Sequence, residues 1–155
     1  MNSILLSLCS SLCAGLLLLS CSSNGDSPEA GDRKGEGAEP PFATSLLLQK
    51  KPESVSQVDI EIMESAPLQF ALNFGLQAPT PGYSPKLGTL ETKGNTLRLR
   101  LDLVPPDGPS LTVLDQVQVR IPLGSLRAGS WFLEVPVYKG NKRTTTLHFT
   151  LEAKQ

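Results

Sequence analysis

The sequence predicts an all-β protein, in which an antiparallel β-sandwich of about seven strands follows a disordered tether. Two observations lead to this class. Apolar and polar residues alternate in a series of short segments from Val58 to Leu151, as they do in strands with one buried and one solvated face. Turns rich in Pro, Gly and Asn separate these segments, and no helical pattern interrupts them.

The alternating segments are the expected strands, and each contributes one apolar set to the core. In chain order these sets are Val58–Ile62, Leu68–Leu76, Leu97–Leu103, Val117–Ile121, Trp131–Val137 and Leu147–Leu151. A further edge strand is expected at Ala43–Leu48, although three consecutive leucines break the alternation there. The principal expected turns are Pro79–Gly82, Lys93–Asn95, Pro105–Pro109 and Lys139–Lys142.

One pattern within these segments points to a more specific kind of sandwich. Leu126, Gly129 and Trp131 form a Leu-x-x-Gly-x-aromatic sequence. This sequence resembles the turn into a late strand of immunoglobulin-like domains, where the aromatic ring packs against the core. The resemblance implies an immunoglobulin-like sandwich over residues 42–155 and a packing role for Trp131.

The N-terminal segment 1–20 is expected to be a signal peptide. Its apolar run from Ile4 to Leu19 spans roughly 16 residues, which is shorter than the ~20 that a membrane-spanning helix needs. Met1-Asn2-Ser3 carries no Lys or Arg, which departs from the usual positive start of a signal peptide. Leu18-Leu19-Ser20-Cys21 resembles the lipobox of bacterial lipoproteins. The resemblance implies cleavage between Ser20 and Cys21 and acylation of the Cys21 thiol.

Acylation would decide where the protein is located. Two acyl chains, such as palmitate, hold a protein stably on a membrane, whereas one chain gives marginal binding. The resemblance therefore implies a lipid-anchored protein of the cell envelope that contacts the membrane through its anchor. Ser22 stands where an Asp would favour the inner membrane of a Gram-negative host. In such a host, the outer membrane is expected, with the domain on its periplasmic or surface face.

Residues 21–41 comprise the lipidated cysteine and a tether. Ser22–Pro41 consists of Gly, Ser, Pro, Asn, Ala and charged residues, without any large apolar side chain. Such a segment buries too little surface to offset its ordering entropy, so disorder is expected. A flexible coil of about 20 residues has a reach of roughly 25 Å.

Composition and charge exclude several function classes. A formal net charge of -1 gives no basic footprint for nucleic acid. Cys9 and Cys13 leave with the signal peptide and Cys21 is acylated, so no thiol remains for a disulfide or for a zinc site of Cys and His ligands. His148, the only histidine, falls on the outward side of its strand. We therefore expect no metal, no cofactor and no enzymatic activity.

A hydrolase with a carboxylate site stays open as an alternative. Such a site needs two carboxylates that converge in a cleft, which sequence spacing alone does not reveal. The acids available for it are scattered over Asp59, Glu61, Asp102, Asp107, Asp115 and Glu134.

One loop carries a second resemblance. Ala78-Pro79-Thr80-Pro81-Gly82-Tyr83 resembles the Asn-Pro-Thr-Thr-Gly-Tyr loop of chagasin-type cysteine-protease inhibitors, which are immunoglobulin-like sandwiches. It also resembles the Pro-Thr-Gly-Gly-Tyr loop of small protease-associated lipoproteins. Pro79, Thr80, Gly82 and Tyr83 match by position, whereas Ala78 and Pro81 depart from the pattern. The resemblance implies a protease inhibitor or a protease-complex subunit, and an ordinary turn is the alternative interpretation.

The expected strand directions place three loops together. If successive strands alternate in direction, Pro79–Tyr83, Pro105–Pro109 and Lys139–Lys142 lie at one end of the sandwich. An exposed Tyr83 on a proline-stiffened loop would lose little entropy on binding a protein or peptide. The candidate partner-binding residues are Pro79, Thr80, Gly82, Tyr83, Asp107, Lys139, Asn141 and Lys142. The sequence thus predicts a lipid-anchored module that binds an envelope protein, a protease or a peptide.

Overall fold

A computed structural model describes residues 39–108 and 113–155 of the chain. The expected signal peptide, the cleavage site at Ser20, the lipidation site at Cys21 and the tether as far as residue 38 lie outside these residues. Within the described residues, no helix is long and apolar enough to cross a membrane.

The described chain forms eight strands in two sheets. The five-stranded sheet has the order β1-β8-β7-β5-β4, and the three-stranded sheet has the order β2-β3-β6. The strands are β1 (Ser45–Lys50), β2 (Val55–Met63), β3 (Gln69–Ala78), β4 (Ser84–Lys93), β5 (Thr96–Val104), β6 (Asp115–Gly124), β7 (Gly129–Lys139) and β8 (Lys142–Lys154).

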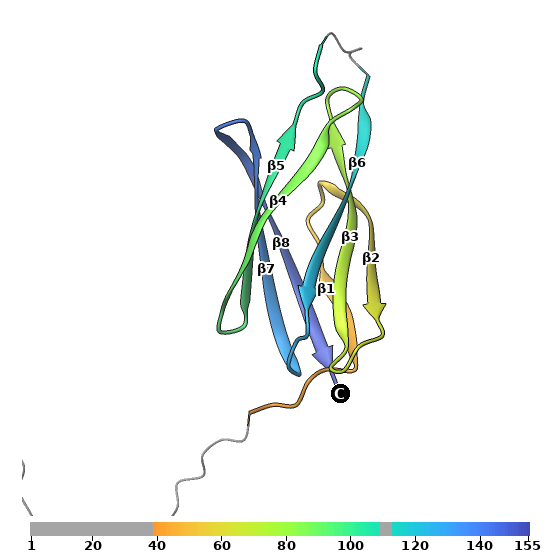
Figure 1. The fold of residues 1–155 in the computed structure, drawn as a ribbon, viewed down its shortest axis with the longest axis vertical. Coiled ribbons are helices and arrows are strands. Elements are labelled where there is room, and N and C mark those ends of the chain that lie inside the picture. Colours follow the sequence, from red (N-terminus) through yellow and green to blue (C-terminus); the bar gives the residue numbers. More distant parts are fainter. Residues whose placement is uncertain (1–38, 109–112) are drawn as a thin grey trace, which may run out of the picture. The chain divides into compact units, whose positions relative to one another are not determined.

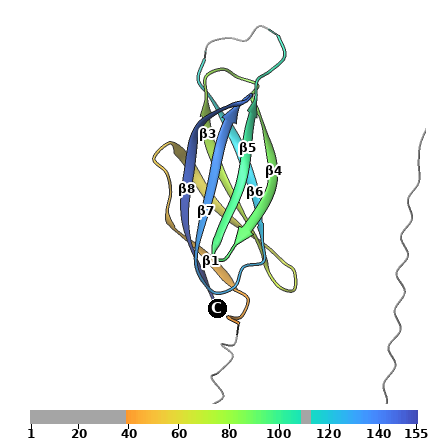
Figure 2. The same cartoon turned by 90° about the vertical axis from the view of Figure 1, so that its left-hand side faces the viewer.

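The two sheets stack as the layers of a sandwich (Figures 1 and 2). All neighbouring strands are antiparallel except β5 and β7, which are parallel. The parallel pair arises because β6, which lies between them in sequence, belongs to the opposite sheet. The predicted all-β sandwich is confirmed, with one strand more than the sequence pattern showed.

The additional strand is β4, at one edge of the five-stranded sheet. Leu87 and Leu90 are its partly buried apolar residues, and they stand three positions apart. A register shift between them, at Gly88 and Thr89, lets both side chains reach the core despite the odd spacing. This bulge destroys the period-two pattern, so β4 carries no clear strand signal in the sequence. The weaker prediction of an edge strand at Ala43–Leu48 corresponds to β1.

Both sheets supply the core. Phe74 of β3 meets Phe149 of β8 across the sandwich, with ring centroids 5.2 Å apart. Leu72, Ile121 and Leu133 are also fully buried. No polar or charged residue is buried in the described part of the chain, so burial of apolar surface drives the folding of this core.

One end of the sandwich is closed by apolar side chains, and we call it the closed end. Ala43, Leu126, Trp131 and Ala153 are all buried there. The Trp131 indole Nε1 donates a hydrogen bond to the Arg127 carbonyl oxygen at 2.8 Å. Trp131 therefore packs into the domain, as the sequence predicts.

The chain joins the domain at this same closed end (Figure 1). Three backbone hydrogen bonds of 2.8 Å tie it down: Ala43 N donates to Leu126 O, Thr44 N to Lys154 O and Ala128 N to Pro41 O. The Arg127 guanidinium donates to Pro40 O and to the Glu39 carboxylate, and it lies 4.8 Å over the Phe42 ring. We call residues 39–44 the clasp.

Candidate functional site

The three loops singled out in the sequence lie together at the end opposite the clasp, which we call the open end. They are the β3–β4 loop (Pro79–Tyr83), the β5–β6 loop as far as Gly108, and the β7–β8 turn at Gly140 and Asn141. Pro109, the last residue of the predicted second loop, lies outside the described residues. β5 and β7 finish side by side because Leu103 aligns with Lys139, and β4 begins there because Ser84 aligns with Val104. All three connections appear at the upper end of the molecule in Figure 1.

Direct contacts link the three loops. The first two loops approach closely at Gly82, where an added side-chain carbon would lie 3.1 Å from Cβ of Pro106. The φ angle of Gly82 is 89°. Only glycine adopts such a conformation without strain. The Lys139 ammonium lies 5.5 Å from the Tyr83 ring centroid, which links the first loop to the β7–β8 turn. Pro105 lines a shallow groove together with Gly140 and Asn141.

The predicted residues differ in exposure at this end. Pro79, Gly82, Asp107, Asn141 and Lys142 are exposed. Thr80, Tyr83 and Lys139 are half-buried, and the Tyr83 ring packs against the core. The sequence suggested an exposed Tyr83; the ring is partly covered because it lies under the Lys139 side chain at the base of its loop.

The core changes character as it reaches the open end. On β8 the inward-facing positions run Leu151, Phe149 and Leu147 and then become Thr145. On β7, Val137 is buried, and the next inward position is Lys139. Lys139 pairs with Leu103 of β5. Polar residues thus replace apolar ones at inward positions. Leu76, Leu103 and Val137 are still buried here, and the polar residues beyond them leave a hollow above this last apolar layer.

This hollow is a pocket of about 280 Å³. Its floor is apolar and comes from both sheets: Leu76 of β3, Leu103 of β5 and Val137 of β7. Its rim is polar and consists of Ser54, Gln77, Lys139, Thr144 and Thr145. The Thr144 hydroxyl already donates to the Val137 carbonyl oxygen at 3.0 Å, which holds this part of the rim in place. We call this the end pocket.

Several cations at the open end lack acidic partners. Lys86, Lys139, Lys142 and Arg143 make no ion pair with any acid of the described residues. Arg143 instead donates to the Thr146 hydroxyl of its own strand. Asp107 and Asp115 stand at the same end and also make no ion pair within the described residues. The positive charge that can attract an anionic group is therefore local, and it lies around Lys139 and Lys142 on the β7–β8 turn.

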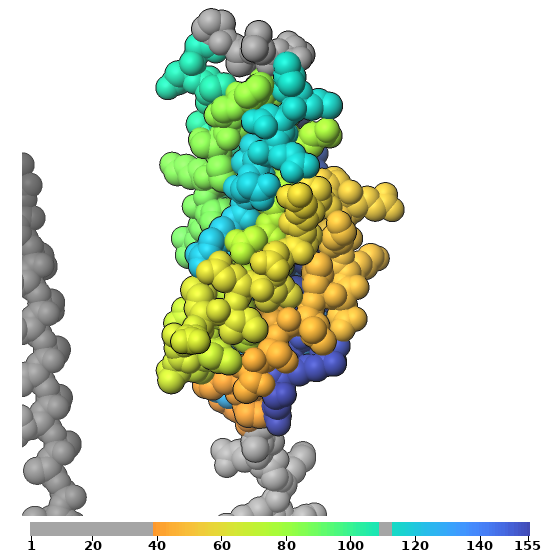
Figure 3. Space-filling view, turned by 90° about the vertical axis from the view of Figure 1, so that its right-hand side faces the viewer, coloured from red at the N-terminus to blue at the C-terminus, as the bar shows by residue number. Residues whose placement is uncertain are grey.

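Aliphatic side chains also project at this end. Val104, Val113 and Leu114 flank the β5–β6 loop, and Leu114 is 68% exposed. In Figure 3 the segments on both sides of this loop form the upper tip of the molecule. The sequence analysis assigned no role to these residues. Their signal was the placement of apolar residues directly beside a turn rich in proline, where burial is not expected.

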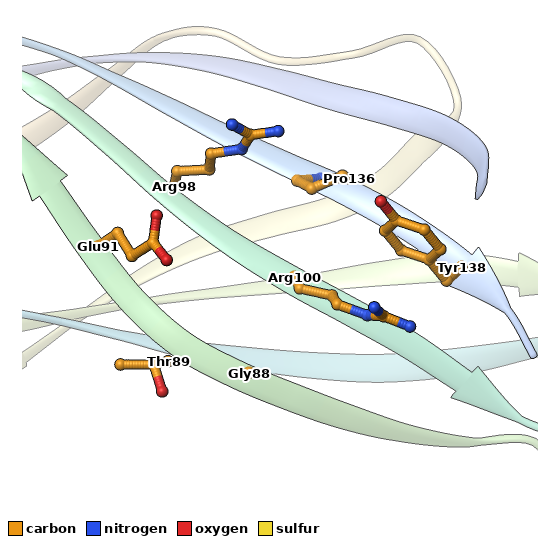
Figure 4. A pocket seen from close by; sticks show the side chains of 7 residues that line it. All are labelled: Gly88, Thr89, Glu91, Arg98, Arg100, Pro136 and Tyr138. Carbon is orange, nitrogen blue, oxygen red and sulfur yellow. The ribbon is translucent and has the colours of Figure 1, made fainter. Parts of the chain in front are cut away.

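A second hollow lies on the outer face of the five-stranded sheet (Figure 4). It is lined by Gly88, Thr89, Glu91, Arg98, Arg100, Pro136 and Tyr138. One of its charged side chains, Arg100, is already paired with Asp102, which lies outside the lining. Arg100 binds both oxygens of Asp102 at 2.7–3.0 Å and lies 4.1 Å over the Tyr138 ring. The hydrogen bonds from Arg100 to Asp102 raise the pKa of Arg100 above its ordinary value.

The remaining acids occupy separate places. Arg120 and Asn73 donate hydrogen bonds to Glu61 on the three-stranded sheet, and they lower the pKa of that carboxyl below its ordinary value. His148 lies on the solvated face of β8, with Nδ1 4.0 Å from Glu134 Oε1. Across residues 39–108 and 113–155, no three His, Cys, Asp or Glu side chains gather as metal ligands.

Comparison with models of known protein families, with curated proteins and with solved structures gave no match in any of the three.

Proposed function

We propose that this chain is a lipid-anchored envelope protein whose open end binds a protein or peptide partner. The observation that carries the proposal is the meeting of three loops at the end opposite the clasp. Prolines stiffen the β3–β4 and β5–β6 loops, so these two loops would lose little conformational entropy on binding. The unpaired cations and exposed aliphatic side chains beside them supply steering and contact area.

The position of the clasp supports this arrangement. An anchor at Cys21 would pull on the domain through the tether, which meets the domain at the closed end. The open end would then be the end that lies farther along the chain's fold from the point of attachment, and the loops there would be free of the anchor. With a tether reach of roughly 25 Å, the loops would sample a wide volume around the anchor.

The anchor is tested by labelling with palmitate in the native host. The wild-type protein should incorporate label and sediment with membranes, whereas Cys21→Ala should do neither. Equal labelling of both forms, or a soluble wild-type protein, would contradict the anchor.

The binding role is tested by crosslinking and capture from the host's own membranes. Lys142→Glu and a swap of the Gly140-Asn141 turn should each weaken capture, because both alter exposed residues of the open end. Lys93→Glu, at the turn of the closed end, is the matched charge control and should capture normally. Melting curves show whether each variant is folded. Full capture by both open-end variants would move the binding site elsewhere.

A second candidate, a protease inhibitor of the chagasin type or a subunit of a protease complex, is favoured by the same geometry. Those inhibitors use three such loops at one end of their sandwich, and Pro79–Tyr83 resembles the first of these loops. The test is inhibition of a papain-type cysteine protease by the purified protein. Inhibition should be lost when the Pro79–Tyr83 loop is replaced by a Gly-Ser segment. No inhibition by a folded wild-type protein would remove the inhibitor. Absence of any protease among the proteins captured from the host's membranes would remove the complex subunit, and neither result affects the more general binding role.

A further inference from the structure

We propose that the end pocket receives the last residue of a partner polypeptide, an aliphatic side chain together with its free α-carboxylate. This inference rests on the proposed function, because it specifies what the open end binds. It follows from the floor, the size and the charge of the pocket.

The floor selects an aliphatic group. Leu76, Leu103 and Val137 belong to the core, and here their upper surfaces meet the pocket instead of another layer of side chains. Thr145 occupies the position where a further apolar residue of β8 would seal the core. A bound aliphatic side chain would complete this layer and remove apolar surface from water.

The size suits a single residue. A volume of about 280 Å³ equals that of about nine water molecules at ~30 Å³ each, or about nine non-hydrogen atoms. A C-terminal leucine has about this number of atoms, counting both carboxylate oxygens. A membrane acyl chain has about twice as many and would extend out of the pocket into solvent.

The charge selects a chain end that carries a carboxylate. Lys139 lies on the rim, and no acid of the described residues pairs with it. Lys142 aligns with Lys139 across the β7–β8 turn and adds to the positive potential. No acidic side chain lines the pocket. The Thr145 hydroxyl and the Gln77 side chain on the rim can donate hydrogen bonds to the same carboxylate.

The test uses the full-length protein in detergent and a dye-labelled peptide, Gly-Ser-Gly-Ala-Leu, with a free C-terminus. Fluorescence anisotropy compares it with the C-terminal amide and with a free acid that ends in Gln. The amide should bind at least about tenfold more weakly, because a charge-assisted hydrogen bond is lost. The Gln peptide should also bind about tenfold more weakly, because it leaves the apolar floor without an aliphatic partner.

Substitutions at the end pocket test whether the peptide binds there. Lys139→Gln should abolish the preference for acid over amide, and Thr145→Trp should fill the pocket and abolish binding of the Leu peptide. Lys93→Gln, at the closed end, is the control and should bind as wild type. Melting curves confirm that each variant is folded. Equal binding of acid and amide by wild type, or an unchanged preference in Lys139→Gln, would overturn the inference.

The outcome separates this inference from the proposed function. If the peptides do not bind but the open-end variants still lose their natural partner, the chain-end inference is wrong and the binding role stands. If those variants also keep their partner, both are wrong.

Discussion

The two ends of this sandwich are built from the same strands but differ in the side chains at their inward positions. At the closed end, Trp131, Leu151 and Ala153 seal the core, and backbone hydrogen bonds fix the clasp. At the open end, the inward positions of β7 and β8 become Lys139 and the exposed Thr145, and the end pocket lies over Leu76, Leu103 and Val137. The closed end has a hollow of its own, of about 480 Å³, but the clasp and Arg127 line it, and its floor is not formed by both sheets. A strand can thus serve stability at one end and recognition at the other.

The charges of the two ends differ in part, although Lys93 at the closed end makes no ion pair with the described acids. Arg127 and Lys154, at the closed end, each pair with an acid, Glu39 and Glu152 respectively. The lysines of the open end have no acidic partner among the described residues. Exposed ion pairs contribute little to stability, so the difference matters chiefly for recognition: charges that are already paired attract a partner less.

The largest expected difference comes from one matched pair of substitutions on β8. Leu151→Ala should cost about 2–5 kcal/mol of unfolding free energy, because it leaves a cavity in the sealed layer. Thr145→Ala, on the same face of the same strand, should cost no more than about 1 kcal/mol, the scale of strand propensity. Urea unfolding measures both. Similar losses would show that the open end is as tightly packed as the closed end.

The next largest expected effect is the loss of unfolding free energy when the clasp is removed. A soluble form that begins at Ser45 loses the buried Ala43 and three backbone hydrogen bonds, which together should cost about 2–3 kcal/mol. A form that begins at Gly37 keeps the clasp and should match a form that begins at Ser22 within about 0.5 kcal/mol. Equal stability of the two forms would mean that the clasp does not hold the closed end together.

A smaller change isolates the Trp131 hydrogen bond. Trp131→Phe keeps an aromatic ring but removes the donor to the Arg127 carbonyl oxygen, at an expected cost of about 1 kcal/mol. The neighbouring Phe132 is 51% exposed on the opposite face, so Phe132→Leu should change stability by less than about 0.5 kcal/mol. A smaller loss for Trp131→Phe than for Phe132→Leu would contradict the packing role of Trp131.

The weakest effect concerns pH and the ion pair between Glu61 and Arg120. The hydrogen bonds from Arg120 and Asn73 lower the Glu61 pKa from 4.5, so the folded state binds its proton less readily than the unfolded state does. The resulting stabilisation is present above the unfolded pKa and is lost as the pH falls through the folded pKa. Glu61→Gln should therefore lose less stability than wild type between pH 7 and pH 3, measured by urea unfolding. Lys142→Gln, at the open end, should keep the wild-type pH dependence.

The sequence predicted the parts of the fold that a period of two describes. The alternation of Leu97 to Leu103 and of Leu147 to Leu151 corresponds to the inward faces of β5 and β8. β4 was not predicted, because its bulge breaks the period of two between Leu87 and Leu90. The parallel pairing of β5 with β7 was not predicted either, because the choice of pairing partner depends on packing between distant segments and leaves no local signal in the sequence.

The sequence predicted which loops make up the candidate site, but it did not predict the end pocket. Turn residues located the three loops, whereas the end pocket depends on two residues that continue the inward phase with polar side chains, Lys139 and Thr145. Each of them looks like an ordinary surface residue in the sequence. Only the register of β5, β7 and β8 shows that they continue the inward phase of their strands, where Lys139 is half-buried and Thr145 is exposed at the rim of the end pocket.

The most direct test of the central claim, that the open end is the binding end, is site-specific photocrosslinking in membranes of the native host. One photoreactive residue replaces Asn141 at the open end, and another replaces Lys93 at the closed end. Both positions are exposed and adjoin hairpin turns, so they are equally accessible. We predict a discrete crosslinked product from position 141 and none from position 93. A product from position 93 alone would place the partner at the closed end and contradict this account.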